Sequence, residues 1–303
     1  MPDGVLNMLK PPGMTSHDVV DGVRRITRMR KVGHCGTLDP AAAGVMVMML
    51  GSATRMSEFL MGCDKVYRAE ITLGVSTDTL DGEGTIIAES DATDVTAERV
   101  SEALAGLTGE LDMVPPMHSA VRHGGRRLYQ IAREGETVEV ESRRVTVHRF
   151  ELLEFTPGER ARALTEVACS SGTYVRSLAA MLGDALDCPA YLSFLVRTRV
   201  GAQRIEDALT GSELNDAAKE KRVAELLGGP EDVLCDWPRI EADHETAVAL
   251  CRGMQIEAPS PLLEGERVLV LTGGRLLCVA EAVADGPATL IQPRRVLLGE
   301  DDL

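Results

Sequence analysis

The chain has 303 residues, 44% of them apolar, so it can bury a core and has room for two domains. It has no apolar run near the ~20 residues of a transmembrane helix, no signal-peptide pattern at its start, and no C-x-x-C pair among its seven cysteines. We therefore expect a cytoplasmic protein with no membrane span, no disulfide framework and no metal site. The net charge of -15 argues against a nucleic-acid partner when the chain is taken as a whole.

The first half of the chain predicts a helix followed by strands. Residues 16–30 read as a helix with Ser16 as its N-cap and with valines at helical spacing on one face. The apolar run 45–50 predicts a strand buried on both faces, although a helix remains an alternative. Residues 67–73 alternate between apolar and polar side chains and predict a half-buried strand.

Further elements follow in alternation. We expect a helix at 96–109 capped by Thr96, and a Pro-rich loop at 115 that turns helical before 135. The remaining elements expected before residue 235 are a strand at 163–169, a turn at 170–172, a helix at 173–186 and an alternating strand at 194–200. After residue 235, short β-type runs separated by GG and DG turns predict a small β-rich domain.

The negative charge is unevenly distributed. Segments 76–110 and 206–245 each carry a net charge of -8, so the rest of the chain sums to +1. That remainder contains five basic clusters, at 24–31, 122–127, 143–149, Arg197/Arg199 and Arg294/Arg295. An acidic chain can thus still present a local basic face to phosphates; solvated surface charge is the alternative interpretation.

The loop GHCGTLDPAAAG, residues 33–44, has three readings from its residues alone. His34, Cys35 and Asp39 are too close in a tight loop to surround one metal ion, and no phosphate-loop pattern is present. A plain Asp-Pro turn, in which Asp39 caps its own backbone, is the ordinary reading. However, Pro40 favours an extended Asp39, and the small residues around it allow close approach of another chain, which suits a loop that presents one carboxylate.

This loop closely resembles the signature loop of the TruB family of tRNA pseudouridine synthases. Other family motifs occur in the same order: LNMLKPPGMTS (6–16), in which Leu9 replaces a common Asp, DKVYRAEITLGVSTDTLDGEG (64–84), PPMHSAVRHGGRRLYQIAREG (115–135), CSSGTYVRSLAAMLG (169–183) and AYLSFLVRTRVG (190–201). The matches span residues 4–201. The end of the chain is similar, more loosely, to the family's C-terminal PUA domain.

The resemblance implies an α/β (α+β) fold with a central mixed, largely antiparallel sheet and a small β-barrel-like PUA domain. It places the catalytic domain at 1–235, with an RNA-binding insertion at about 105–150, and the PUA domain at 236–303. The implied reaction is isomerisation of uridine to pseudouridine at position 55 in the T-loop of tRNA, with the base flipped out and with no metal or organic cofactor. The implied partner is tRNA, through its T-loop, T-stem and acceptor arm, and we expect a monomer that needs no protein partner.

The resemblance also assigns catalytic roles. Asp39 is the implied catalytic carboxylate and Arg176 its cationic partner, which would counter the pKa rise of a carboxylate in a dry pocket. Tyr67 is the implied base-stacking residue and candidate acceptor of the C5 proton. From the residues alone, Arg176 also fits a surface helix and Tyr67 a core-facing strand position.

Substrate-binding roles follow in the same way. Tyr174 is expected to hydrogen-bond through its hydroxyl or simply to pack, and Leu195 to line the pocket. His34 is expected either to contact the flipped nucleotide or its phosphate, or to bond to its own loop, and Lys10 to support the loop. The candidate phosphate contacts are Arg24, Arg25, Arg28, Arg30, Arg122, Arg126 and Arg127.

Two other functions fit the same motifs. One is the related archaeal and eukaryotic type of pseudouridine synthase, which works with guide RNAs and protein partners; the length of 303 residues without lysine-rich tails favours the stand-alone bacterial type. The other is a non-catalytic RNA-binding protein or tRNA chaperone, which the presence of Asp39, Tyr67 and Arg176 disfavours.

Overall fold

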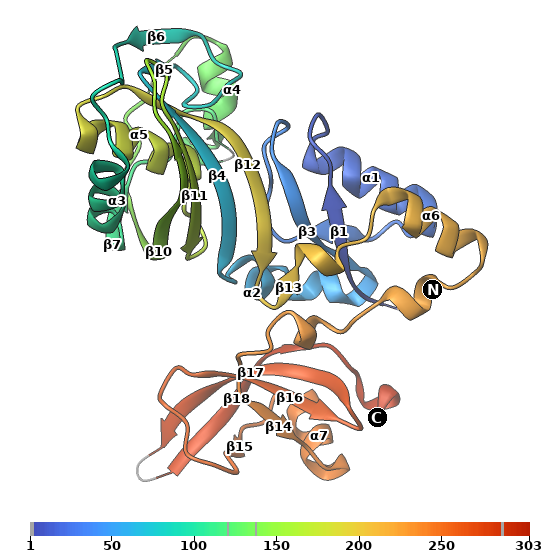
Figure 1. Ribbon diagram of the computed structural model, residues 1–303. Helices are drawn as coiled ribbons and strands as arrows, with labels where there is room; N and C mark the ends of the chain where they lie inside the picture. Colours follow the sequence, from blue (N-terminus) through green and yellow to red (C-terminus); the bar gives the residue numbers. More distant parts are fainter. Residues whose placement is uncertain (1–2, 120, 137, 286–287) are drawn as a thin grey trace.

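The computed structural model describes residues 3–119, 121–136, 138–285 and 288–303. Ala120, the last residue of the P-P-x-x-S-A segment, therefore lies outside the described residues. The chain forms a long mixed sheet flanked by helices and a smaller C-terminal sheet (Figure 1). This arrangement confirms the expected mixed α/β class with a largely antiparallel central sheet.

The central sheet has nine strands, and its main path runs β1-β3-β12-β4-β11-β10-β7. Only the contact between β12 and β3 is parallel among the described pairings of this sheet. Its strands are β1 Gly4–Lys10, β2 Val32–His34, β3 Ala43–Leu50, β4 Lys65–Leu73, β7 Gly109–Met113, β10 Arg143–Thr156, β11 Arg162–Cys169, β12 Ala190–Val200 and β13 Gln203–Arg204.

Two predicted strands lie at the centre of this sheet. Strand β3 is buried from Gly44 to Leu50, as its unbroken apolar sequence predicted. In β4, Tyr67, Ala69 and Ile71 are buried while Arg68 is exposed, which confirms the alternation read from the sequence. These two strands lie on either side of β12 in the sheet. The residues just before and just after each of them are therefore held in fixed positions.

The first helix, α1 Ser16–Thr27, begins differently from the prediction. Its N-cap is Thr15, whose side chain accepts from the backbone N–H of Asp18 while Asp18 accepts from the N–H of Thr15. Ser16 is instead the first helical residue and is buried. The helix ends before residue 30 because Arg28 adopts the left-handed conformation, with φ 57°.

The remaining helices cover both ends of the sheet. Helices α3 and α5 pack beside β10, β11 and β4, whereas α1 and α6 lie at the opposite end beside β1 and β3 (Figure 1). None of the helices in the described ranges is both long and apolar enough to cross a membrane. Their bounds are α2 Ser57–Met61, α3 Ala97–Gly106, α4 Leu128–Arg133, α5 Val175–Leu186, α6 Gly211–Lys219 and α7 His244–Cys251. The 3₁₀ turns are η1 Gly51–Met56, η2 Ile205–Asp207, η3 Val223–Leu226, η4 Pro230–Asp232 and η5 Glu300–Asp302.

Two small hairpins project from the central sheet. One joins β5 Val75–Thr77 to β6 Ile86–Glu89, within the first acidic segment. The other joins β8 Arg122–His123 to β9 Arg126–Arg127 and precedes α4. The sequence predicted only a loop and a helix in this second region, because two-residue strands leave too few positions for an alternating pattern.

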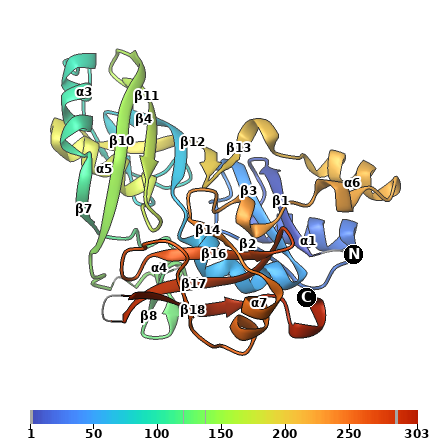
Figure 2. The same ribbon diagram turned by 90° about the horizontal axis from the view of Figure 1, so that it is seen from below.

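The C-terminal sheet has the order β14-β16-β17-β18-β15 and is accompanied by α7 (Figure 2). Its strands are β14 Arg239–Glu241, β15 Ile256–Glu257, β16 Arg267–Thr272, β17 Arg275–Asp285 and β18 Ala288–Val296. The C-terminal part contacts the central part of the protein. The ring of Trp237, just before β14, meets that of Phe59 edge to face, and Arg295 of β18 pairs with Glu58 at 2.6 Å. The boundary after residue 235 and the insertion at 105–150 stay predictions.

Candidate active site

Asp39 lies in the loop that joins β2 to β3, and two side chains from the start of the chain hold this loop. The Ser16 hydroxyl donates to the carbonyl of Leu38 at 3.0 Å and accepts from the N–H of Leu38 at 2.9 Å. The fully buried Lys10 donates to the carbonyls of Pro11, Pro40 and Ala42. These bonds hold the backbone on both sides of Asp39. The supporting role expected for Lys10 stays a prediction.

Replacing Lys10 with methionine is expected to lower stability and activity together. Burial, the largest influence, lowers the pKa of Lys10, while the Asp39 carboxylate partly opposes this. The substitution leaves buried carbonyls without a donor, at about 1–3 kcal/mol for each unsatisfied group. Urea unfolding should therefore show a lower midpoint than wild type. An unchanged midpoint with reduced activity would instead assign Lys10 a role in the reaction.

Arg176 brings the predicted catalytic carboxylate and helix α5 together. Its side chain is 5% exposed, and its Nε lies 3.0 Å from an Oδ atom of Asp39. Its Nη1 lies 3.5 Å from Asp81 and donates to the carbonyl of Thr79, and its Nη2 donates to the carbonyl of His118. The guanidinium thus contacts two carboxylates and two carbonyls at once, which suits arginine, with its five donors, rather than lysine.

The environment of Asp39 shifts its protonation. Burial raises the pKa of the Asp39 carboxyl, Arg176 lowers it, Asp81 raises it and Lys10 lowers it, in that order of size, with a net rise. The side chain nevertheless keeps 42% of its surface accessible. The Asp39 carboxylate is thus partly accessible to solvent while a buried guanidinium contacts it.

Tyr67 faces the same region from strand β4. It is 8% exposed and belongs to the apolar cluster that includes Leu38 and Ala42 of the Asp39 loop, so the core-facing position read from the strand pattern is confirmed. Burial raises the pKa of Tyr67, and Arg197 partly opposes that rise. Tyr67 therefore belongs to the same core cluster as residues on both sides of Asp39.

Tyr174 and Leu195 pack against this same apolar cluster. Tyr174 is the N-cap residue of α5, two positions before Arg176, and the guanidinium of Arg143 stacks 5.7 Å from its ring centre. Leu195 stands beside Ala69 in the pairing of β12 with β4. Both side chains lie next to the residues expected to react, and their roles stay predictions.

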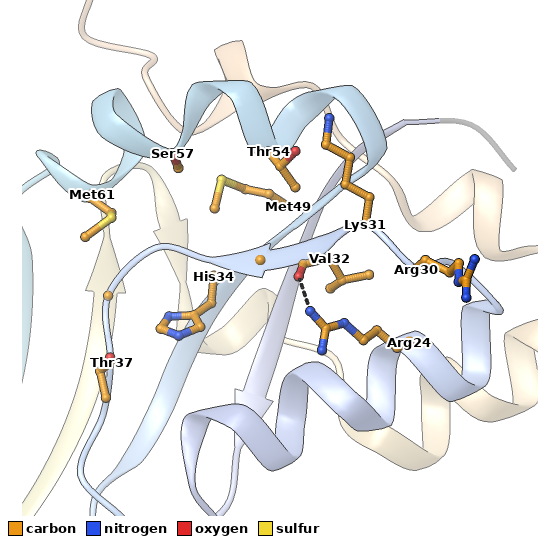
Figure 3. Close-up of a pocket in the computed structure, with 12 residues that line it drawn as sticks. Arg24, Arg30, Lys31, Val32, His34, Thr37, Met49, Thr54, Ser57 and Met61 are labelled. Atoms are coloured by element: carbon orange, nitrogen blue, oxygen red, sulfur yellow. Dashed lines mark hydrogen bonds between the residues drawn. The ribbon is translucent and has the colours of Figure 1, made fainter. Parts of the chain in front are cut away.

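His34 lines a basic cavity on the outer side of the loop. The cavity has a volume of about 610 Å³ and is lined by Arg24, Arg30, Lys31, His34 and Thr37, among others (Figure 3). His34 Nδ1 and Arg24 Nε are buried without a hydrogen-bond partner among the described residues. Burial, followed by the nearby Arg197, lowers the pKa of His34, so its imidazole is neutral at neutral pH.

The arginines that are candidate phosphate contacts differ in whether their side chains already bond to other residues of the protein. Arg24 donates to Asp21 and to the carbonyl of Val32 from within α1. Arg28 follows that helix, and with Arg25 and Arg30 it lines a second hollow of about 660 Å³. Arg126 lies in the β8–β9 hairpin and forms ion pairs with Glu134 and Glu136, so it is not an unpaired surface cation.

Sequence reasoning missed three residues that the structure places here. Asp81 was visible as the last acid of TDTLD, but its contact with Arg176 joins distant segments. Ser16 was taken for a helix cap rather than a support of the Asp39 loop. Arg197 was counted in a surface basic cluster; this is wrong, because it is 1% exposed and its Nε donates to the carbonyl of Val45.

The loop does not have the features of a metal site. Cys35 is fully buried, and burial raises the pKa of its thiol to about 12, so it is protonated at neutral pH. Asp39 is engaged by Arg176. Across the described ranges, no group of three or more His, Cys, Asp or Glu side chains is arranged to hold a metal ion.

A family model and two relatives with similar sequences carry pseudouridine synthase names. A family model for "TruB family pseudouridylate synthase (N terminal domain)" matches residues 24–175. A protein from Symbiobacterium thermophilum, named "tRNA pseudouridine synthase B", is 51% identical over 83% of this chain and 82% of its own length. One of the same name from Moorella thermoacetica is 43% identical over 97% of this chain and 99% of its own length.

Solved structures share the fold. One described as "Crystal Structure of a Cbf5-Nop10-Gar1 Complex" superposes with a TM-score of 0.77 at 25% identity, over 99% of this chain and 86% of the other. Another, described as "Structure of H/ACA RNP bound to a substrate RNA containing 2'-deoxyuridine", gives a TM-score of 0.74 at 24% identity, over 98% of this chain and 86% of the other. Both superpositions extend over the C-terminal sheet as well as the central one.

Proposed function

The chain belongs to the TruB family of pseudouridylate synthases, and we propose that it isomerises uridine to pseudouridine at position 55 in the T-loop of tRNA. The enzyme class and the tRNA substrate rest on the names of relatives that match almost the whole chain. The assignment of the target to position 55 rests on the family resemblance of the motifs.

The observation that carries the proposal is the half-exposed Asp39 carboxylate held by the buried Arg176 at 3.0 Å. In the reaction the N1–C1′ bond of uridine breaks, the uracil turns, and a C1′–C5 bond forms. C5 then loses its proton and N1 gains one, so the product is an isomer of the substrate. An ionised carboxylate beside C1′ fits this chemistry, as nucleophile or as base.

The residues around Asp39 supply the other groups that the reaction needs. Arg176 keeps Asp39 ionised against the effect of burial and fixes its direction. Tyr67 stacks on the flipped uracil and its phenolate oxygen takes up the C5 proton. Tyr174 and Leu195 close the pocket around the base, which excludes water from the reacting carbon.

The substrate's phosphates meet the basic face of α1 and the cavity beside the Asp39 loop. Arg24, Arg30 and Lys31 line a cavity whose wall continues through His34 to Thr37, two residues before Asp39 (Figure 3). A target base in a folded RNA loop must be extruded before it can react, and fixed phosphates beside it hold the backbone during that step. The C-terminal sheet, as a PUA-like domain, extends the contact to the acceptor arm.

Neutralising Arg28 and Arg30 together is expected to weaken tRNA binding and to flatten its salt dependence. Each lost phosphate contact reduces the slope of log K against log salt by about 1. Filter binding of an unmodified transcript over a range of salt concentrations measures both quantities. The matched control is Arg222→Gln, because Arg222 lies in the acidic segment 206–245 and pairs there with Glu220 and Glu225. An unchanged slope in the Arg28→Gln/Arg30→Gln variant would place the tRNA elsewhere.

The position of the target is tested with transcripts labelled at the C5 hydrogen of uridine. Wild-type protein alone is expected to release the label from a tRNA transcript, and to release one equivalent less when the uridine at position 55 is replaced by cytidine. Release without any guide RNA or added protein would also support the stand-alone form of the enzyme. A requirement for a guide RNA would favour the archaeal and eukaryotic type of pseudouridine synthase, which works with guide RNAs.

A further inference from the structure

Arg197 is a fully buried cation beneath the candidate active site. It is 1% exposed; its Nε donates to the carbonyl of Val45 at 2.8 Å, and its Nη2 donates to the carbonyl of Gly36 at 3.1 Å. Within the described ranges, no carboxylate forms an ion pair with it. A buried charge without a countercharge lowers the stability of the folded state. Its presence here therefore points to a functional role for Arg197.

The partner of Arg197 across the sheet is Tyr67. The two residues stand directly opposite each other in the antiparallel pairing of β12 with β4, so their side chains lie on the same face of the sheet. The Arg197 charge lowers the pKa of Tyr67 against the effect of burial. Arg197 thus joins the Asp39 loop at Gly36 and β3 at Val45 to the strand position opposite Tyr67.

One cation, one carboxylate and one thiol are the titratable groups nearest to Tyr67. The groups that face it are Arg197 from β12, the Cys169 thiol from β11 and the Asp39 carboxylate from its loop. Burial raises the pKa of the Cys169 thiol to about 11, so it is neutral at neutral pH. Behind Arg197 lies the buried Lys65, whose Nζ donates to the carbonyls of Met61 and Cys63.

We propose that Arg197 is a positioning residue for the isomerisation, which fixes the Tyr67 oxygen against the Asp39 loop and stabilises the phenolate that takes up the C5 proton. This inference rests on the proposed function. The Tyr67 phenol first loses its proton to water. The phenolate then takes the proton from C5 of the rejoined base, the C5–C6 double bond is restored with the freed electron pair, and N1 takes a proton from water.

The charge and the geometry of Arg197 can be separated by two substitutions. Arg197→Lys keeps the charge but loses the planar fork, and Arg197→Gln loses the charge. Burial already raises the pKa of Tyr67 and Arg197 lowers it, so loss of the charge moves phenolate formation to higher pH. The matched control is Arg199→Gln, which removes an exposed arginine two positions along the same strand.

The experiment measures single-turnover release of the C5 label from saturating tRNA between about pH 6 and pH 9.5, together with tRNA affinity. Because the pKa of Tyr67 is raised above its ordinary value, this whole pH range lies below it, and Arg197→Gln is expected to be slower by about 10-fold or more at every pH in the range. Arg197→Lys is expected to lose less rate than Arg197→Gln because it keeps the charge, and Arg199→Gln to match wild type in rate. An equal loss of rate in Arg197→Gln and Arg197→Lys would overturn the charge role, and a wild-type rate in both variants would overturn the whole inference.

A second measurement tests the proposal even if the Arg197 variants do not fold. A fluorinated tyrosine, whose phenol is more acidic, is placed at position 67 in the otherwise unaltered chain. The rise in rate is expected to move to lower pH; an unmoved profile would contradict the phenolate step. Label release by wild type is the reference in every series, so its absence would reject the proposed function itself rather than the role of Arg197.

Discussion

Replacing Asp39 with asparagine is expected to abolish release of the C5 label while leaving tRNA binding intact. Loss of an essential catalytic group costs more than about 10³-fold in rate. Stability should not fall with it. Because burial raises the pKa of Asp39 in the folded protein, the ionised carboxylate destabilises the fold at pH values above that raised pKa, and this penalty disappears as the pH falls through it.

Two measurements check this prediction. Single-turnover kinetics gives the loss of rate, and thermal unfolding at neutral pH should give a midpoint at or above that of wild type. Asp91→Asn serves as the matched control, because Asp91 is an exposed carboxylate that accepts hydrogen bonds from the N–H and the hydroxyl of Thr93, far from Asp39 in the sequence. Residual activity within about 10-fold of wild type would remove Asp39 from the reaction.

Replacing Arg176 with lysine is expected to have the second-largest effect, on both activity and stability. The contacts of the guanidinium with Asp39, Asp81 and the carbonyls of Thr79 and His118 are lost, although a charge remains. Breaking such a buried arrangement typically costs about 3 kcal/mol or more. The rate should fall about 10²-fold or more, as when one preorganised electrostatic contact is removed.

The pH profile separates a role in the reaction from a structural one. Arg176 lowers the pKa of Asp39 against the effect of burial, so a weaker contact raises that pKa further. The acid side of the rate profile should therefore move to higher pH in Arg176→Lys, because Asp39 must be ionised to act. A uniformly lower rate with an unmoved acid limb would mean that Arg176 only supports the fold.

Local patterns in the sequence predicted the elements that carry the site. The alternation at 67–73 placed Tyr67 on the buried face, and the apolar run at 45–50 predicted the strand that leaves the Asp39 loop. Both predictions succeeded because they depend on side chains within one segment. The cap of α1 was misplaced by one residue, since Thr15 and Ser16 are equally able to cap a helix and only the bond from Ser16 to Leu38 separates them.

Such local patterns could not predict the contacts between segments that lie far apart in the sequence. Arginine is normally exposed, so Arg197 was placed on the surface. Strand β12 has irregular pairing between Leu192 and Phe194 and again between Arg197 and Arg199, which breaks its simple alternation. As a result Arg197 is buried and Phe194 is 49% exposed. The contact of Asp81 with Arg176 likewise exists only in the folded chain.

The measurement that tests the account most directly is a crystal structure of the Asp39→Asn protein bound to an unreacted T-stem-loop RNA. We expect the target uridine to be flipped out, with its C1′ about 3–3.5 Å from the side chain at position 39 and its base stacked on Tyr67. A target base that stays stacked in the loop, or a C1′ that faces away from Asp39, would contradict the central claim that this carboxylate carries out the isomerisation.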